Sequence, residues 1–314
     1  MNDQLLIGIQ TGKWFDKSKP IESMRLAKEL GIEAIDYGFE YIFRPNEFVK
    51  GTKYPIVELP ETEFIETFSL LKQASEENGV KIAQIHAPFP VYFEDNPTVN
   101  DYCIKVLEKM LGASAYLNCK QFVVHPHQDA WQPHQNQKWV KQNIEMYSKL
   151  IKKAKECGVT VCLENLQCEE NDQIVGGICS SADETIYLID TLNQIAGEKV
   201  FGFCLDVGHA NACGVNIYDF IKKVGDRITA LHIHDNDGKS DAHLIPYTQV
   251  KDQWGVDLGL DWEGFIKGLK EINYLGCLSF ETFRAFHHLP REVWKEGLIL
   301  NVAIGKYFRK RILE

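Results

Sequence analysis

Short apolar runs alternate with longer amphipathic segments along the 314-residue chain. The runs carry aliphatic side chains at consecutive positions, which is typical of strands buried on both faces of a parallel sheet. We expect strands at residues 5–11, 34–38, 81–87, 121–125, 160–165, 202–207, 228–234 and 278–282. Between them, apolar residues recur at helical spacing. We expect helices at residues 21–30, 63–77, 101–117, 140–156, 185–195, 217–224, 262–272 and 292–312.

Turn signals support this alternation. Gly31, Gly79 and Gly158 each follow the last apolar turn of an expected helix, where a capping glycine is common. Ser181, with Glu184 three residues later, predicts a capping box. Eight strand–helix units with right-handed crossovers close naturally into a (β/α)₈ TIM barrel, so we interpret residues 1–314 as one such domain. A doubly wound open sheet is the alternative.

The loops at the two ends of the expected barrel differ in length. Long segments rich in Pro, Gly, Asn and aromatic residues follow the strands at 41–60, 88–99, 126–139, 166–180 and 235–260. The turns at the opposite end, such as 78–80 and 157–159, are tight. Long loops on one face predict a mouth that encloses a substrate at the C-terminal ends of the strands.

Composition narrows the class of partner. The 44 acidic residues exceed the 34 basic ones and give a net charge of −10, which argues against a nucleic-acid partner. Nine cysteines without a CxxC pair indicate free thiols in a reducing compartment. The first ten residues are too short and too acidic for a signal peptide, and no apolar run approaches the length of a membrane span. We therefore expect a cytoplasmic protein with no membrane partner.

Metal-binding side chains end four consecutive expected strands. Glu164 lies in CLEN, Asp206 lies in CLDVGH, His232 opens HIHDND, and Glu281 lies in SFETF. Such groups are rarely buried unless they are paired or hold a metal. Three carboxylates would repel each other, so a divalent cation is the simplest partner for them. Mixed oxygen and nitrogen ligands suit Mn²⁺, Co²⁺ or Mg²⁺, and also Zn²⁺.

Other acid–base residues follow the same strand ends. His86 and His125 end two earlier strands, and we expect both in the pocket. His209 could reach the pocket or cap the following turn, while the pair Asp241 and His243 could bind a second ion, clamp a hydroxyl or tie the loop together. Strand alternation places His234 near the pocket and Asp235 in the loop. The chain has no GxxxxGK[ST] or GxGxxG motif, so a nucleotide cofactor is not supported.

The ordered motifs HAPF, HPH, LEN, DVGHA, LHIHDND, SDAH and FET resemble the sugar-phosphate isomerase/epimerase superfamily, which has the xylose isomerase-like TIM barrel fold. The resemblance covers nearly the whole chain. It implies a metal-dependent sugar isomerase or epimerase of carbohydrate metabolism with one divalent ion. The implied metal ligands are Glu164, Asp206, His232 and Glu281. Glu164 and Glu281 would also move a proton between the two faces of the substrate carbon through an enediolate.

The superfamily also contains endonuclease IV-type DNA repair enzymes, whose three-metal site has nine ligands. That pattern adds His86, His125, His209, Asp241 and His243, which the isomerase interpretation assigns to substrate binding. However, DVGHA replaces a DTCHA-like run and HPHQD replaces HPGS. Metal-dependent dehydratases and C-glycoside-cleaving lyases are further alternatives on the same scaffold. We expect a small carbohydrate substrate and leave homo-oligomer formation open, since the apolar positions of the last helix suit either barrel closure or a subunit interface.

Overall fold

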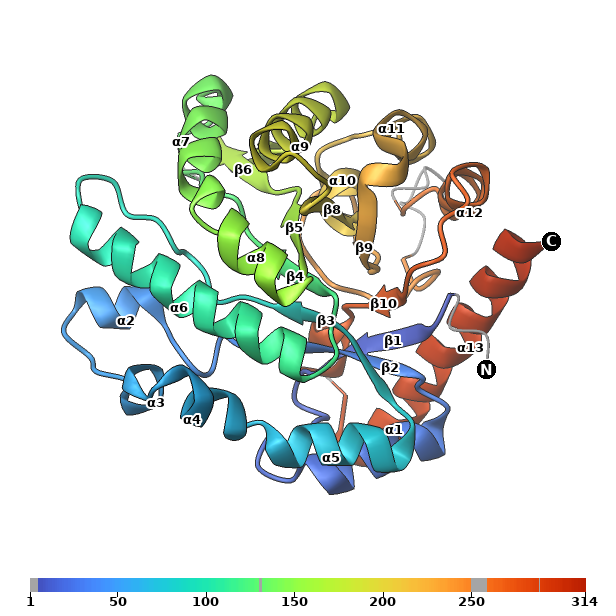
Figure 1. Cartoon of the computed structure of the whole chain (residues 1–314). Helices are drawn as coiled ribbons and strands as arrows, with labels where there is room; N and C mark the ends of the chain where they lie inside the picture. Colours follow the sequence, from blue (N-terminus) through green and yellow to red (C-terminus); the bar gives the residue numbers. More distant parts are fainter. Residues whose placement is uncertain (1–4, 130–131, 250–258, 288) are drawn as a thin grey trace.

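The computed structural model describes residues 5–129, 132–249, 259–287 and 289–314. Its main sheet has eight strands, all paired in parallel, in the order β10-β1-β2-β3-β4-β5-β8-β9 (Figure 1). The strands are β1 (Ile7–Gln10), β2 (Ala34–Gly38), β3 (Lys81–His86), β4 (Gln121–Val124), β5 (Thr160–Glu164), β8 (Phe201–Asp206), β9 (Ile228–His232) and β10 (Leu278–Phe280). All eight predicted strands are confirmed.

Backbone hydrogen bonds join the first and last members of this order. The amide of Ile233 donates to the carbonyl of Ser279 at 2.8 Å, and the amide of Glu281 donates to the carbonyl of Ile233 at 3.0 Å. These bonds connect the end of β9 to β10 and close the sheet. The fold is therefore the predicted (β/α)₈ barrel, and the open-sheet alternative is wrong.

Helices surround the barrel (Figure 1). The longer ones are α1 (Pro20–Leu30), α5 (Ser69–Asn78), α6 (Pro97–Tyr116), α7 (Asn136–Ser148), α8 (Ile151–Cys157), α9 (Ala182–Ala196), α11 (Ile217–Val224), α12 (Trp262–Glu271) and α13 (Trp294–Leu313). Shorter helices are α2 (Pro45–Val49), α3 (Pro55–Glu58), α4 (Glu61–Glu66), α10 (Val207–Ala212), η1 (Gly225–Arg227), η2 (Phe283–His287) and η3 (Arg291–Val293). No helix among the described residues is long and apolar enough to cross a membrane.

Two predicted helices are each split in two. The expected helix at 63–77 divides into α4 and α5, because the hydroxyl of Thr67 donates to the carbonyl of Phe64 at 2.6 Å and competes with the helical pattern. The expected helix at 140–156 divides into α7 and α8 around Leu150, which is fully buried. At both breaks the backbone bonds three residues back, from Phe68 to Ile65 and from Leu150 to Tyr147, so a tighter turn interrupts each helix.

The predicted helix ends are correct, but one predicted cap is wrong. Gly31, Gly79 and Gly158 all cap their helices in the left-handed conformation. Ser181 is the N-cap position of α9, yet its side chain makes no capping hydrogen bond. The carboxylate of Glu184 instead accepts a hydrogen bond from the amide of Cys179 at 2.7 Å, so no capping box forms.

Small side chains fill the barrel interior below the strand ends. Val123, Cys162, Cys204 and Ala230 form a buried apolar cluster contributed by four neighbouring strands. A larger apolar cluster packs the sheet against the helices. All nine cysteines are free thiols, as predicted. This packed interior leaves the C-terminal strand ends as the place where polar side chains can gather.

The loop after β5 contains an antiparallel hairpin that was not predicted. Its strands are β6 (Gln167–Glu170) and β7 (Gln173–Gly176), joined by Asn171 and Asp172 in the left-handed conformation. In the last helix, Leu298 and Val302 are buried, whereas Leu300 is 43% exposed. Leu298 and Val302 therefore pack into the core, and α13 lies against α1 and β1 (Figure 1).

Candidate active site

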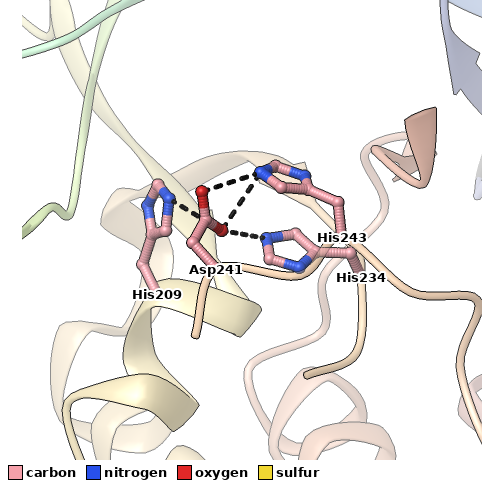
Figure 2. Close-up of side chains that lie close together, drawn as sticks. All are labelled: His209, His234, Asp241 and His243. Carbon is pink, nitrogen blue, oxygen red and sulfur yellow. Dashed lines mark hydrogen bonds and ion pairs between the residues drawn. The ribbon is translucent and has the colours of Figure 1, made fainter. Parts of the chain in front are cut away.

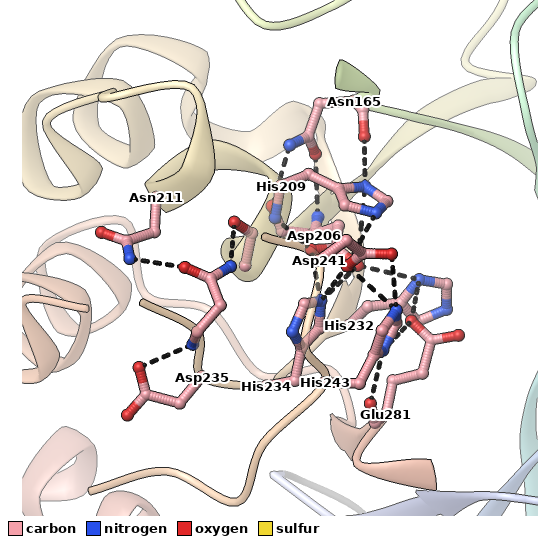
Figure 3. Close-up of polar contacts among 12 residues, drawn as sticks. Asn165, Asp206, His209, Asn211, His232, His234, Asp235, Asp241, His243 and Glu281 are labelled. Carbon is pink, nitrogen blue, oxygen red and sulfur yellow. Dashed lines mark hydrogen bonds and ion pairs between the residues drawn. The ribbon is translucent and has the colours of Figure 1, made fainter. Parts of the chain in front are cut away.

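Four side chains from β5, β8, β9 and the end of β10 meet at the centre of the barrel mouth. The Nδ1 atom of His232 lies 3.2 Å from Glu164 Oε2, 3.4 Å from Glu281 Oε2 and 3.8 Å from Asp206 Oδ2. Figure 3 shows Asp206, His232 and Glu281 converging from separate segments. The structure therefore brings together all four residues predicted as metal ligands.

These groups are removed from water. Glu164 is 1% exposed, Glu281 is 7% exposed, and Asp206 and His232 have no exposed surface. Among the described residues, His232 Nδ1 and Glu164 Oε2 have no partner in hydrogen-bonding geometry. Buried polar atoms without a partner are costly. Three carboxylates around one imidazole nitrogen, with orphaned atoms facing inward, fit a divalent cation.

The protonation of the two glutamates differs. Burial alone would raise the pKa of Glu164, but the charges of His232 and His125 outweigh it and hold the pKa well below its ordinary value. Burial also raises the pKa of Glu281, and there it prevails together with repulsion from Asp206 and Glu164, so this pKa lies well above its ordinary value. Without a cation, the site thus favours one ionised and one protonated glutamate.

The other two members respond to the same field. Burial would raise the pKa of Asp206, but His209 and His234 lower it to about 2. Burial would lower the pKa of His232, yet its acidic neighbours Cys204, Glu281 and Glu164 raise it well above its ordinary value. The raised pKa values of His232 and Glu281 favour their protonated forms, with which a bound cation would compete.

His86 and His125 face Glu164 from β3 and the end of β4. Their Nε2 atoms lie 3.4 Å and 3.5 Å from Glu164 Oε2. His86 Nδ1 lies 2.7 Å from the carbonyl of Ala87, which aims the other nitrogen at the carboxylate. The ring of Phe89 stacks on His125 with centroids 4.0 Å apart. Both histidines therefore lie in the pocket, where they were predicted.

A second group of potential ligands lies beside the first, and it consists of His209, His234, Asp241 and His243 (Figure 2). Asp241 Oδ1 lies 3.1 Å from His243 Nε2, 3.6 Å from His209 Nε2 and 3.9 Å from His234 Nε2. Burial would raise the pKa of Asp241, but the surrounding histidines lower it below its ordinary range. The structure thus brings His209, Asp241 and His243 into the pocket, and this group could also hold a cation.

His234 connects the two groups. Its Nε2 atom lies 2.9 Å from Asp206 Oδ1, and its ring stacks on His243 with centroids 4.0 Å apart. The ring also lies directly over Gly208, where a Cβ atom would overlap it. Asp235 turns away and accepts hydrogen bonds from Leu260 and Trp262 in the following segment. The predicted split between these adjacent residues is confirmed.

Three further polar residues were not predicted to belong to the site. Gln10 donates to Glu281 Oε1 at 2.6 Å, and the buried Asp36 lies 3.0 Å from His232 Nε2. Gln84 donates to Asp36 Oδ2 at 2.9 Å. A signal was present, because a carboxylate and two amides interrupt otherwise apolar strands. The partners of Gln10 and Asp36 lie 271 and 196 residues away along the chain, so these contacts exist only in the closed barrel.

A cavity of about 580 Å³ opens over the two groups of potential metal ligands. Among the residues that line it are both glutamates, His86, His125, His209, Asp241 and His243, with Phe15, Phe89 and Phe283 as apolar walls. Another cavity of about 530 Å³ lies at the opposite end of the barrel, near Lys72, Lys120 and Cys277. The cavity at the C-terminal strand ends has the size of a small-molecule site, and it combines apolar walls with convergent polar groups.

Comparisons with known proteins agree with this architecture. The chain is 28% identical over 213 residues to an uncharacterized protein from Methanocaldococcus jannaschii. This match covers 63% of each chain. It is 29% identical over 134 residues to a D-psicose 3-epimerase from Enterocloster bolteae. That match covers 43% of this chain and 37% of the relative. The matches therefore span less than two thirds of the length of either relative.

A solved structure shares the fold over nearly its whole length. The crystal structure of a D-psicose 3-epimerase in the presence of D-fructose has a TM-score of 0.70, with 97% of this chain and 99% of that chain covered at 16% identity. The family model described as xylose isomerase-like TIM barrel matches residues 24–300. With the closed eight-stranded barrel, this match shows that the chain belongs to the xylose isomerase-like TIM barrel family.

Proposed function

We propose that the protein is a divalent-metal-dependent isomerase or epimerase of a small sugar or sugar derivative. The observation that carries the proposal is the pair of glutamates. Glu164 and Glu281 both line the cavity and approach the same nitrogen of His232 at 3.2 Å and 3.4 Å. The sugar-epimerase names of the D-psicose 3-epimerase relative and of the similar solved structure support this substrate class.

The four residues of the centre would have two roles, cation binding and proton transfer. Asp206 and His232, buried below the cavity, would hold the cation together with Glu164 and Glu281. The cation would supply a positive charge that polarises a substrate carbonyl and acidifies the neighbouring C–H bond. Glu164 and Glu281 reach the same centre from different strands, so one is placed to remove the proton from the substrate carbon and the other to return it.

The pocket walls would orient the substrate. His86, His125, His209, Asp241 and His243 offer donors and acceptors for hydroxyl groups around the cavity. The rings of Phe15, Phe89 and Phe283 cover apolar faces of the same space and would help to exclude water. This combination of a polar floor and apolar walls suits a small polyol that carries a carbonyl group.

A panel of ketoses and aldoses in D₂O tests the proposal. The purified protein is treated with a chelator and then reloaded with Mn²⁺, Co²⁺ or Mg²⁺. We expect about one tightly held ion per chain, loss of activity on chelation and recovery on reloading. Solvent deuterium should appear on the carbon next to the substrate carbonyl. Turnover that is unaffected by complete metal removal would refute the proposal.

A second candidate function, endonuclease IV-type cleavage at abasic sites, is favoured by one observation. The nine residues of the three-metal pattern all lie in the two adjacent groups around Glu164 and Asp241. The net charge of −10 argues against it, because nucleic-acid binding relies on cationic surfaces. Three Zn²⁺ ions per chain and nicking of abasic duplex DNA would establish it. We expect neither result.

A further inference from the structure

We propose that Asp36 is a positioning residue for His232. Its carboxylate holds a proton on Nε2 of the imidazole and so presents Nδ1 to the three carboxylates of the centre. The inference rests on the proposed function in one respect, namely that Glu164, Asp206, His232 and Glu281 bind a divalent cation. It assigns a role in that centre to a residue that lies outside the cavity.

The contact between the two side chains is direct and dry. Asp36 lies on β2 and has no exposed surface, and its Oδ2 atom is 3.0 Å from Nε2 of the equally buried His232. The Gln84 amide already donates to Asp36 Oδ2, so this oxygen acts as an acceptor and Nε2 is placed to donate to it. The Nδ1 atom is then the nitrogen whose lone pair is available to a cation.

Gln84 fixes Asp36 in this orientation. Its side-chain amide donates to Asp36 Oδ2 at 2.9 Å and to the carbonyl of Leu231 at 3.1 Å. Leu231 precedes His232 on β9, so one amide ties the carboxylate to the backbone that carries the imidazole. Asp36 and Gln84 are also register partners on β2 and β3. The carboxylate therefore has little freedom to swing away from His232.

The arrangement divides the barrel into two halves. The proposed cation ligands come from β5, β8, β9 and the end of β10, whereas β1, β2 and β3 supply the amides and carboxylate behind them. Gln10 and Asp36 are register partners and so occupy one level of the barrel. Gln10 holds Glu281 as Asp36 holds His232. Partners of this kind typically change metal affinity by about 10- to 100-fold.

The test compares Asp36→Asn and Asp36→Ala with the wild type. Affinities for Mn²⁺ and Zn²⁺ are measured by competition with a chelating indicator, which requires no substrate. We expect about 10-fold weaker binding for Asp36→Asn, which keeps the volume but removes the charge, and about 100-fold for Asp36→Ala. In the Zn²⁺-loaded wild type, long-range ¹⁵N spectra should show a protonated Nε2 and a metal-bound Nδ1 for His232.

Asp235→Asn is the matched control. Asp235 is also a buried aspartate at the mouth, but its carboxylate accepts from Leu260 and Trp262 at 3.2 Å and not from His232. This variant should lose stability and keep wild-type metal affinity within about twofold, because its partners lie outside the centre. A purely structural role for Asp36 predicts the same pattern for Asp36→Asn.

The outcomes separate the two proposals. If the wild type binds no divalent cation, both this inference and the proposed function fail. If the wild type binds a cation while Asp36→Asn matches its affinity and its His232 spectrum, the role of Asp36 is overturned and the proposed function stands. If Asp36→Ala does not fold, the isosteric Asp36→Asn variant decides the question by the same measurements.

Discussion

At the scale of single residues, the two glutamates are the sharpest test of the proposed proton transfer. Converting Glu164 or Glu281 to Gln keeps the side-chain volume and removes its basicity. Loss of a general acid or base typically costs about 10²- to 10⁴-fold in rate, so turnover should fall by at least the lower figure in each variant. Deuterium exchange at the substrate carbon in D₂O should disappear in parallel, as followed by mass spectrometry.

The control for these variants is a carboxylate outside the centre. Glu170→Gln makes the same change on the hairpin, where Glu170 pairs with the exposed His134 at 3.2 Å, and it should leave turnover unchanged. Metal affinity should fall less in Glu164→Gln than in His232→Ala, because an amide oxygen still coordinates weakly. Product that forms without any solvent deuterium would indicate a hydride shift instead and would contradict the two-glutamate mechanism.

At the scale of elements, α10 and the end of β9 are coupled through one glycine. A Cβ atom on Gly208 would overlap the His234 ring, so Gly208→Ala should destabilise the protein by about 1–3 kcal/mol through overpacking. Urea unfolding measures this cost. In a His234→Ala background the clash is gone, and the same change should be neutral or stabilising, because Ala favours a helix by about 1 kcal/mol over Gly. An equal cost in both backgrounds would contradict the coupling.

The elements also show how far the sequence carries. Consecutive apolar residues predict all eight barrel strands, because burial on both faces leaves no ambiguity of period. The break at Thr67 and the missing cap at Ser181 were not predictable. Each depends on which of several nearby backbone groups the side chain bonds to. Asp36 was missed for a different reason. Its meaning comes from His232, which is 196 residues away and adjacent only once the barrel closes.

At the scale of the whole molecule, closure of the barrel brings side chains from four strands into one charged centre. The strand-end rule for TIM barrels predicts that Glu164, Asp206, His232 and Glu281 converge, and their convergence is observed. The rule does not predict that the pKa of Glu164 is lowered while the pKa of Glu281 is raised. That difference depends on how many histidines face each carboxylate, which only the packed barrel determines.

This centre makes metal binding and stability depend on pH in opposite ways. The pKa of His232 lies above its ordinary 6.5, so its contribution to the stability of the metal-free protein is complete below about pH 6.5 and is lost as pH rises through the folded-state value. The pKa of Asp206 is lowered to about 2, so its contribution is present above about pH 3.9 and is lost as pH falls through the lower value. From these two groups, the metal-free protein should be most stable between about pH 4 and 6.5.

A bound cation reverses the upper part of this profile, because it requires His232 Nδ1 and Glu281 to be free of protons. Metal binding should therefore release protons, and affinity should rise as pH increases above the ordinary histidine pKa of about 6.5. Calorimetry in buffers of different ionisation enthalpy counts the protons, and thermal unfolding with and without Mn²⁺ measures the stabilisation. The increase in Tm caused by Mn²⁺ should grow with pH over this range. A pH-independent increase, with no proton released, would show that the cation does not bind at His232 and Glu281.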